Sequence, residues 1–232
     1  SFTVRLNGLD VCCKGANWIP IDNFPHRRSR DDYDRLIGDA AECNMNMLRV
    51  WGGGIYENED FYAACDSLGV MVWQDMAFAC GMFPADSAYL ASVSAEVRDN
   101  IRRLRNHPSI VLWCGNNENE ISYFEWGWNR TLTGEQQKDY EAGLRRLFYE
   151  TIPEAIAMED DTRYYHPSSP STGHSGVPYS MGDAHFWSVW KGGWVEEYLK
   201  PGNIARFMSE YGFIAYPEMA SLKQFIPDWD MR

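Results

Sequence analysis

The feature that most constrains the fold is the alternation of short apolar segments with amphipathic segments along the chain. Predicted strands lie at 11–18, 47–51, 70–73, 110–113, 163–165, 184–187 and 205–209, and predicted helices at 29–42, 59–68, 92–105, 135–157, 194–199 and 219–225. Helices between strands favour parallel pairing, because a parallel connection must cross back over the sheet. The sequence therefore predicts an α/β protein with a parallel sheet, either doubly wound or closed into a barrel.

Polar residues where the strands end favour the barrel. They are Asn17, Arg49, Asp75, Glu118, His185 and Glu210. In a barrel these strand ends share one face, which is where active sites occur. The glycines at 52–54 lack the spacing of a dinucleotide site. We expect a (β/α)8 TIM barrel truncated before its eighth strand. Residues 1–232 would form a partial catalytic domain, and the first residues would be the tail of a preceding β domain.

Charge and hydropathy exclude two classes of partner. The formal net charge is −12, which disfavours binding to nucleic acid because polyanions require a basic face. No apolar run approaches the roughly 20 residues that a membrane span requires. The chain is rich in Trp, with 10, and Tyr, with 13. Such side chains either fill a core or pack against the faces of sugar rings.

The cysteines and one sequon bear on the compartment. None of the six cysteines forms a C-x-x-C pair, so we expect mostly buried free thiols and a reducing compartment such as the cytoplasm. The triplet Asn129-Arg130-Thr131 is a glycosylation sequon, which points weakly to secretion. The compartment stays open between cytoplasm, lysosome and secretion. The sequence predicts no metal and no cofactor.

Two carboxylates are the strongest candidates for chemistry. Glu118 follows the apolar segment 110–113, and Glu210 follows the segment 205–209. Hydrolysis of a glycoside with retention requires an acid that protonates the leaving oxygen and a second carboxylate that attacks the anomeric carbon. Strands four and seven of a barrel face each other across its mouth and could hold this pair. A lone glutamate would more often be a loop cap or a surface ion pair.

Six segments carry a family resemblance. Residues 110–118, IVLWCGNNE, resemble the acid/base motif of family-two glycoside hydrolases in its β-mannosidase form, and residues 209–213, SEYGF, resemble the nucleophile motif of that family. Similar family-like segments occur at 14–18, 48–57, 72–75 and 185–187. Because the six segments occur in order along nearly the whole chain, the resemblance is specific.

The resemblance implies a role for each site residue. Glu118 would be the acid/base, with a pKa raised by partial burial. Glu210 would be the nucleophile, and Arg49 would keep it ionised. Asn117 would bind the sugar 2-hydroxyl, and Asp75 other hydroxyls. Trp51, Trp126 and Trp187 would wall the sugar subsite, His185 would support the site, and Tyr211 would help to orient the nucleophile.

Structural alternatives to these roles stay open. Arg49 could merely pair with an acid, Asp75 could cap a helix, His185 could be structural, and Trp51 and Trp187 could be core residues. Glu120 also follows an asparagine, but the family motif favours Glu118.

The resemblance implies removal of terminal non-reducing β-D-mannose from β-mannoside oligosaccharides by a chain with flanking β-sandwich domains. The alternatives are a β-galactosidase or β-glucuronidase of the same family, or a non-catalytic sugar-binding barrel.

Overall fold

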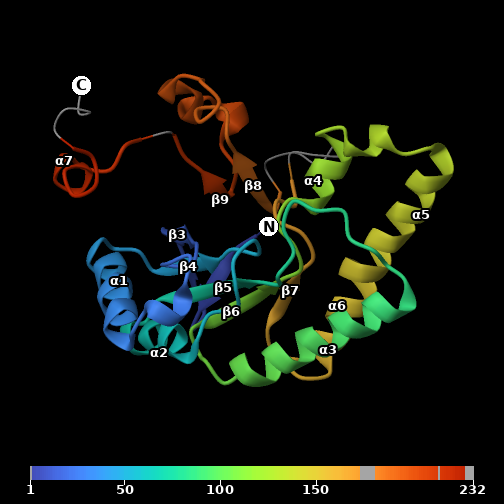
Figure 1. The fold of residues 1–232 in the computed structure, drawn as a ribbon, viewed down its shortest axis with the longest axis horizontal. Helices are drawn as coiled ribbons and strands as arrows, with labels where there is room; N and C mark the ends of the chain where they lie inside the picture. Colours follow the sequence, from blue (N-terminus) through green and yellow to red (C-terminus); the bar gives the residue numbers. More distant parts are fainter. Residues whose placement is uncertain (1, 173–180, 214, 228–232) are drawn as a thin grey trace.

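The computed structural model describes residues 2–172, 181–213 and 215–227, and it forms a partial α/β barrel (Figure 1). The parallel strands are β3 (Gly15–Trp18), β4 (Met47–Val50), β5 (Met71–Asp75), β6 (Ile110–Cys114), β7 (Tyr164–His166), β8 (Asp183–Phe186) and β9 (Phe207–Tyr211). The helices are α1 (Arg30–Glu42), α2 (Glu59–Leu68), α3 (Ser87–Leu104), α4 (Asn119–Phe124), α5 (Gly134–Arg145), α6 (Ile152–Ala157) and α7 (Met219–Leu222). The predicted fold class is confirmed.

The strands form two separate sheets. Strands β3, β4, β5, β6 and β7 pair in sequence order, and β8 pairs with β9; every one of these pairings is parallel. In Figure 1, β8 and β9 lie above the strands of the larger sheet. A cavity of about 1080 Å³ lies between the β3 side and β9, and Asn17 bridges the two by donating to the Ser209 carbonyl over 3.2 Å.

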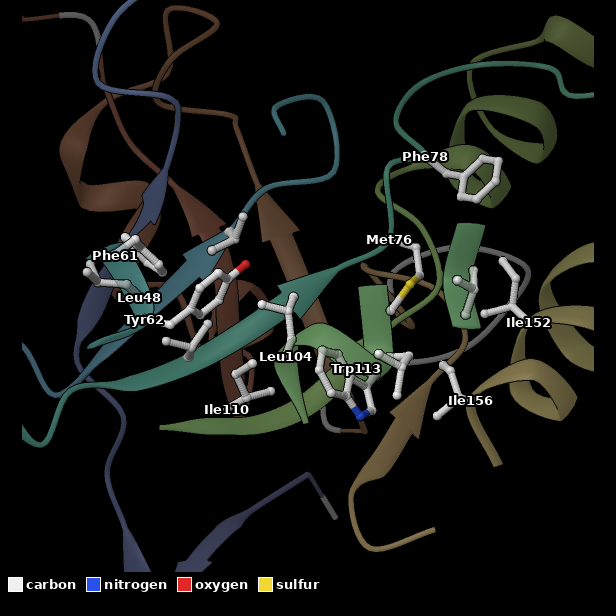
Figure 2. Close-up of a cluster of buried hydrophobic side chains, with 14 of the residues drawn as sticks. Leu48, Phe61, Tyr62, Met76, Phe78, Leu104, Ile110, Trp113, Ile152 and Ile156 are labelled. Atoms are coloured by element: carbon white, nitrogen blue, oxygen red, sulfur yellow. The ribbon is translucent and has the colours of Figure 1, made fainter. Parts of the chain in front are cut away.

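The two strand faces pack into different cores, as the period-two alternation of a strand requires. On β4, Leu48 and Val50 join a large cluster with the apolar faces of the helices, whereas Met47 joins a smaller cluster inside the barrel with Trp73. Figure 2 shows part of the large cluster, in which Phe61 of α2 is fully buried. Burying a side chain of this kind stabilises the fold by about 1.5–3 kcal/mol.

Local sequence signals set most helix ends. Asp32 accepts a hydrogen bond of 3.0 Å from the backbone N–H of Ser29 at the start of α1, and Gly69 ends α2 with a left-handed φ of 70°. Helix α3 begins at Ser87, five residues before its predicted start, because Asp86 accepts from the N–H groups of Ala88 and Tyr89.

Other predicted boundaries need correction. The long helix predicted over 135–157 is divided by a π-helical segment, Arg146–Thr151, rather than broken at Pro153. The segment predicted as a helix at 194–199 is a 3-10 helix, Val195–Leu199, and the 3-10 segments Pro25–Arg27, Trp128–Thr131 and Pro201–Asn203 were not predicted. Residues 173–178 of a predicted loop over 167–178 lie outside the described residues.

The start of the chain packs against the barrel strands, and its origin as the tail of a preceding β domain stays a prediction. The strand predicted over 11–18 is confirmed only as the shorter β3 (Gly15–Trp18), and a hairpin that was not predicted, β1 (Val4–Leu6) and β2 (Leu9–Val11), precedes it. The hairpin turns at Asn7 and Gly8, which both have positive φ. Beside it, the Phe2 ring lies 5.5 Å from Trp73 and 5.0 Å from Phe207, so it fills the barrel interior below the strand ends.

The cysteines are all free, as expected, but most of them are not buried. Only Cys65 and Cys114 are buried. In the part of the chain that the structure describes, no helix combines the length and apolar character needed to cross a membrane.

Candidate active site

Four side chains from four strands converge at the carboxyl ends of the strands. Arg49 comes from β4, Glu118 from the segment after β6, His185 from β8 and Glu210 from β9. One ligand-type atom from each of Glu118, His185 and Glu210 lies within 4.8 Å of the other two, and all three residues are buried. Side chains separated by 161 positions, Arg49 and Glu210, are in direct contact.

Glu210 is buried and held by two donors. Arg49 Nη1 donates to its Oε1 over 2.7 Å, and Trp187 Nε1 donates to its Oε2 over 3.2 Å. Only 6% of Glu210 is exposed. Glu210 was expected just after its strand, but it lies inside β9. A buried carboxylate with a fixed cation and a fixed donor is oriented for attack on an electrophile.

Arg49 organises the strand ends through four partners. Besides Glu210, its guanidinium donates to Asp75 Oδ2 over 2.9 Å, to Asn117 Oδ1 over 2.7 Å and to Asn17 Oδ1 over 3.3 Å. Burial by itself lowers the pKa of Arg49, but the carboxylates of Asp75 and Glu210 outweigh this effect and raise it. Arg49 is therefore a permanent cation at the centre of the site.

Asp75 lies behind Arg49 and contacts only protein groups among the described residues. Its side chain is fully buried and accepts from Arg49, from Trp73 Nε1 over 2.8 Å and from the backbone N–H of Gly52 over 3.0 Å. These contacts hold Arg49 in place, and the expected contact of Asp75 with sugar hydroxyls stays a prediction. Asp75 is also not a helix cap, because no helix begins at this residue.

Removing Arg49 should be costly for the fold. We expect Arg49→Ala to lower the free energy of unfolding by about 3–5 kcal/mol, because it leaves Asp75 and Glu210 as buried charges without a cation. Urea unfolding measures this change. Arg35→Ala is the matched control, since Arg35 and Asp39 are 62% and 61% exposed in their pair and exposed pairs contribute about 0–1 kcal/mol. Equal losses in the two variants would contradict the assignment.

Glu118 has an unusual backbone and a short hydrogen bond. Its φ is 61°, in the left-handed region. Its Oε1 lies 2.7 Å from His185 Nδ1, and its Oε2 accepts from Cys80 Sγ over 3.3 Å. Burial by itself raises the pKa of Glu118, but the hydrogen bond and charge of His185 and the Cys80 contact outweigh it and lower this pKa. The expectation of a raised pKa is therefore wrong, because the sequence shows burial but not the opposing partner.

A register shift between β8 and β9 places His185. Ala184 pairs with Met208, but His185 pairs with Glu210, so Ser209 is skipped. Such bulges redirect side chains near active sites. His185 Nδ1 consequently lies 2.7 Å from Glu118 and 3.4 Å from Glu210. Two carboxylates and an imidazole could in principle hold a metal ion, but the Arg49 cation already neutralises Glu210, so we assign no metal site here.

The predicted aromatic residues differ in their positions. Trp187 contacts Glu210, and Trp51 is half-buried beside the backbone of Gly53. Trp126 is 46% exposed, and its ring lies 6.2 Å from Trp128. Tyr211 is 59% exposed, and its described ring contact is with Tyr198 rather than with the nucleophile candidate. Trp187 is therefore the aromatic residue whose described contacts reach the carboxylates.

Two parts of the site were not predicted. Cys80 contacts both Asn117 and Glu118, yet it lies in an irregular segment without a sequence signal. Ser169 contacts His185 from the loop after β7, and Asp183 lies behind it. The spacing Asp183-x-His185 places both residues on one face of β8 and was a usable signal for the aspartate.

Several known proteins are similar to this chain. Residues 44–139 match the family model of glycosyl hydrolases family 2, TIM barrel domain. The chain is 39% identical to the β-mannosidase of Bos taurus over 100% of this chain and 27% of that protein. The structure matches the crystal structure of a β-D-mannosidase from Dictyoglomus thermophilum with a TM-score of 0.86 and 45% identity, over 99% of this chain and 27% of that one.

A more distant match shares the fold alone. The β-glucuronidase of Bacteroides uniformis is 21% identical and matches with a TM-score of 0.65, over 81% of this chain and 22% of that one. The chain thus spans about 27% of the length of the β-mannosidases that it resembles.

The fold and these matches show that the chain is similar to the TIM-barrel domain of glycosyl hydrolase family 2. Within that family, the chain resembles the β-mannosidases over its whole length, and the resemblance seen in the sequence motifs is confirmed.

Proposed function

We propose that this chain is the catalytic part of a retaining glycoside hydrolase that removes terminal non-reducing β-D-mannose from β-mannosides. One observation carries the proposal: the oxygens of Glu118 and Glu210 approach within 4.8 Å across the strand ends. Retaining enzymes hold their two carboxyl groups about 5–5.5 Å apart, whereas inverting enzymes leave about 6.5–9.5 Å for a water molecule. The resemblance to β-mannosidases supports the choice of sugar.

The proposed reaction divides the work between the carboxylates. Glu118 donates a proton to the leaving oxygen while Glu210 attacks the anomeric carbon, so the C–O bond of the leaving group breaks as the glycosyl-enzyme bond forms. Water then releases the sugar, with Glu118 accepting its proton. The contacts of Glu210 support its role as the nucleophile, because Arg49 Nη1 and Trp187 Nε1 hold one carboxylate oxygen each.

Other residues are proposed to hold the sugar. Asn117 lies beside Glu118, with its amide oxygen on Arg49 and its Nδ2 on Cys80 Sγ, 3.6 Å away. Its role at the sugar 2-hydroxyl stays a proposal, as do the roles of Trp51 and Trp126 as subsite walls. Trp187 has the strongest support, because its indole already contacts Glu210. No cofactor is needed for these steps. The flanking β-sandwich domains also stay a prediction.

The substrate is tested by comparing leaving-group release from three glycosides. With the full-length protein, we expect nitrophenol release from 4-nitrophenyl β-mannoside at a kcat/KM at least about 10²-fold above that for the β-galactoside and the β-glucuronide, a preference of roughly 3 kcal/mol. Preference for galactoside or glucuronide would keep the reaction class and reject the sugar. Tight binding of mannose without any turnover would favour a non-catalytic barrel instead.

A further inference from the structure

A chain of hydrogen bonds runs from Glu118 into the barrel interior, behind the proposed site. His185 Nδ1 lies 2.7 Å from Glu118, and His185 Nε2 lies 3.1 Å from Ser169 Oγ. Ser169 Oγ in turn lies 2.6 Å from Asp183 Oδ2. Ser169 and Asp183 are fully buried, and His185 is 7% exposed. A buried chain of this kind is ordered, because each member has a defined partner.

The direction of each hydrogen bond follows from the ionisation of Asp183. Burial by itself raises the pKa of Asp183, but the hydrogen bonds of His166 and Ser169 outweigh it and hold this pKa well below its usual range. An ionised carboxylate only accepts hydrogen bonds. Ser169 must therefore give its single hydroxyl proton to Asp183, in a short charge-assisted bond.

This assignment fixes the tautomer of His185. Since the Ser169 proton points to Asp183, Ser169 Oγ can only accept from His185, so Nε2 of the imidazole carries a proton. The Nδ1 side then faces Glu118 over 2.7 Å. A bare nitrogen lone pair against a bare carboxylate would repel at that distance, so one proton must lie between these two atoms.

Resting on the proposed function, we infer that Asp183 and Ser169 lock His185 in its Nε2–H state and so keep the acid proton on the Glu118–His185 hydrogen bond. Glu118 and His185 together hold the proton that the leaving oxygen requires, whether that proton lies nearer to the Glu118 oxygen or to His185 Nδ1. After donation, water returns one proton to Glu118, and Nε2–H is unchanged throughout. Ser169 and Asp183 are thus positioning residues, which act on the acid without touching the sugar.

The other charged groups around His185 are consistent with this assignment. From β9, Glu210 Oε2 lies 3.4 Å from Nδ1, and it is neutralised by Arg49. Ser209 donates to the same Asp183 oxygen as Ser169, over 2.5 Å, so its proton is also directed away from His185. On the far side, His166 Nε2 lies 2.7 Å from Asp183 Oδ1. Asp183 therefore has donors on both oxygens.

The test compares leaving groups that do and do not need a proton. In Ser169→Ala, we expect kcat/KM to fall about tenfold or more on β-linked mannobiose, because general-acid catalysis contributes roughly 10²–10⁴-fold. On 2,4-dinitrophenyl β-mannoside, whose phenolate leaves without protonation, it should stay within about twofold. A merely structural loss would lower both values equally, and that result, or no change on either substrate, would overturn the inference.

The control and a second measurement separate the possible failures. Ser168→Ala removes the hydroxyl of the adjacent buried serine, which bonds Asn116 and not His185, and should keep the parent's ratio of the two rates. Imidazole ¹⁵N shifts of the unmodified protein should show Nε2 of His185 protonated, and a bare Nε2 would overturn the inference without any variant. Glu210→Gln, measured in parallel, tests the proposed function itself. If that variant stays active, the proposed function is rejected, and the inference about the His185 tautomer is rejected with it.

Discussion

Glu210→Gln should abolish hydrolysis of 4-nitrophenyl β-mannoside, with kcat reduced by about 10³-fold or more, the scale seen when a nucleophile is lost from groups that act as a unit. The amide keeps the size of the side chain and can still accept from Arg49 or Trp187, but it cannot form a stable glycosyl ester. Because Arg49 keeps its pair with Asp75 in this variant, the fold should persist, which circular dichroism can check.

A matched control separates the loss of the nucleophile from the general effect of neutralising a buried carboxylate. Glu57 is 1% exposed and accepts from Trp18 Nε1 and the Tyr33 hydroxyl, on the outer side of the strands. Glu57→Gln should retain mannoside hydrolysis within a few-fold, although it is buried as deeply. Residual activity in Glu210→Gln equal to that in Glu57→Gln would assign the nucleophile to another residue.

Glu118→Ala should slow turnover of 2,4-dinitrophenyl β-mannoside by about 10²–10⁴-fold, the usual contribution of general acid–base catalysis. Formation of the glycosyl-enzyme should persist in this variant, since the dinitrophenolate leaves without a proton. The glycosyl-enzyme should then accumulate, because no base activates the water that hydrolyses it. Added azide needs no base, so it should restore turnover and yield β-mannosyl azide, with retained configuration. Mass spectrometry identifies that product.

The neighbouring carboxylate provides the control for this second experiment. Glu120 lies two residues beyond Glu118 and accepts from the Tyr149 hydroxyl over 2.6 Å. Glu120→Gln should turn over the dinitrophenyl substrate at close to the parent rate and gain nothing from azide. Azide rescue of a Glu120 variant instead of the Glu118 variant would reverse the assignment that the motif favours.

The sequence was sufficient for the order of strands and helices and for the residues at the strand ends. The alternation of apolar and amphipathic segments predicted the parallel strands, and the caps at Ser29 and Gly69 predicted helix ends. Arg49 and Glu210 were expected to meet, and they do. The hairpin was missed although Asn7-Gly8 is a strong turn signal, because the segment was interpreted as a tail from another domain.

The remaining features depend on contacts between distant segments. That Asp75 turns away from the site follows from its bonds to Arg49 and Trp73, which no local pattern records. The position of His185 depends on a register shift opposite Ser209. The lowered pKa of Glu118 depends on that same histidine, 67 positions away. Sequence spacing identifies such groups as candidates, but packing decides which of them face each other.

The left-handed backbone at Glu118 sets a limit on how stable this protein can become. Glu118 and its contact Cys80 both have positive φ, at 61° and 42°, a conformation that costs a residue with a side chain roughly 1–2 kcal/mol. Strain of this kind persists only where surrounding structure enforces it. Selection for thermostability alone would therefore favour glycine at Glu118, where the proposed chemistry requires a carboxyl group, so heat resistance must be gained from residues elsewhere in the barrel.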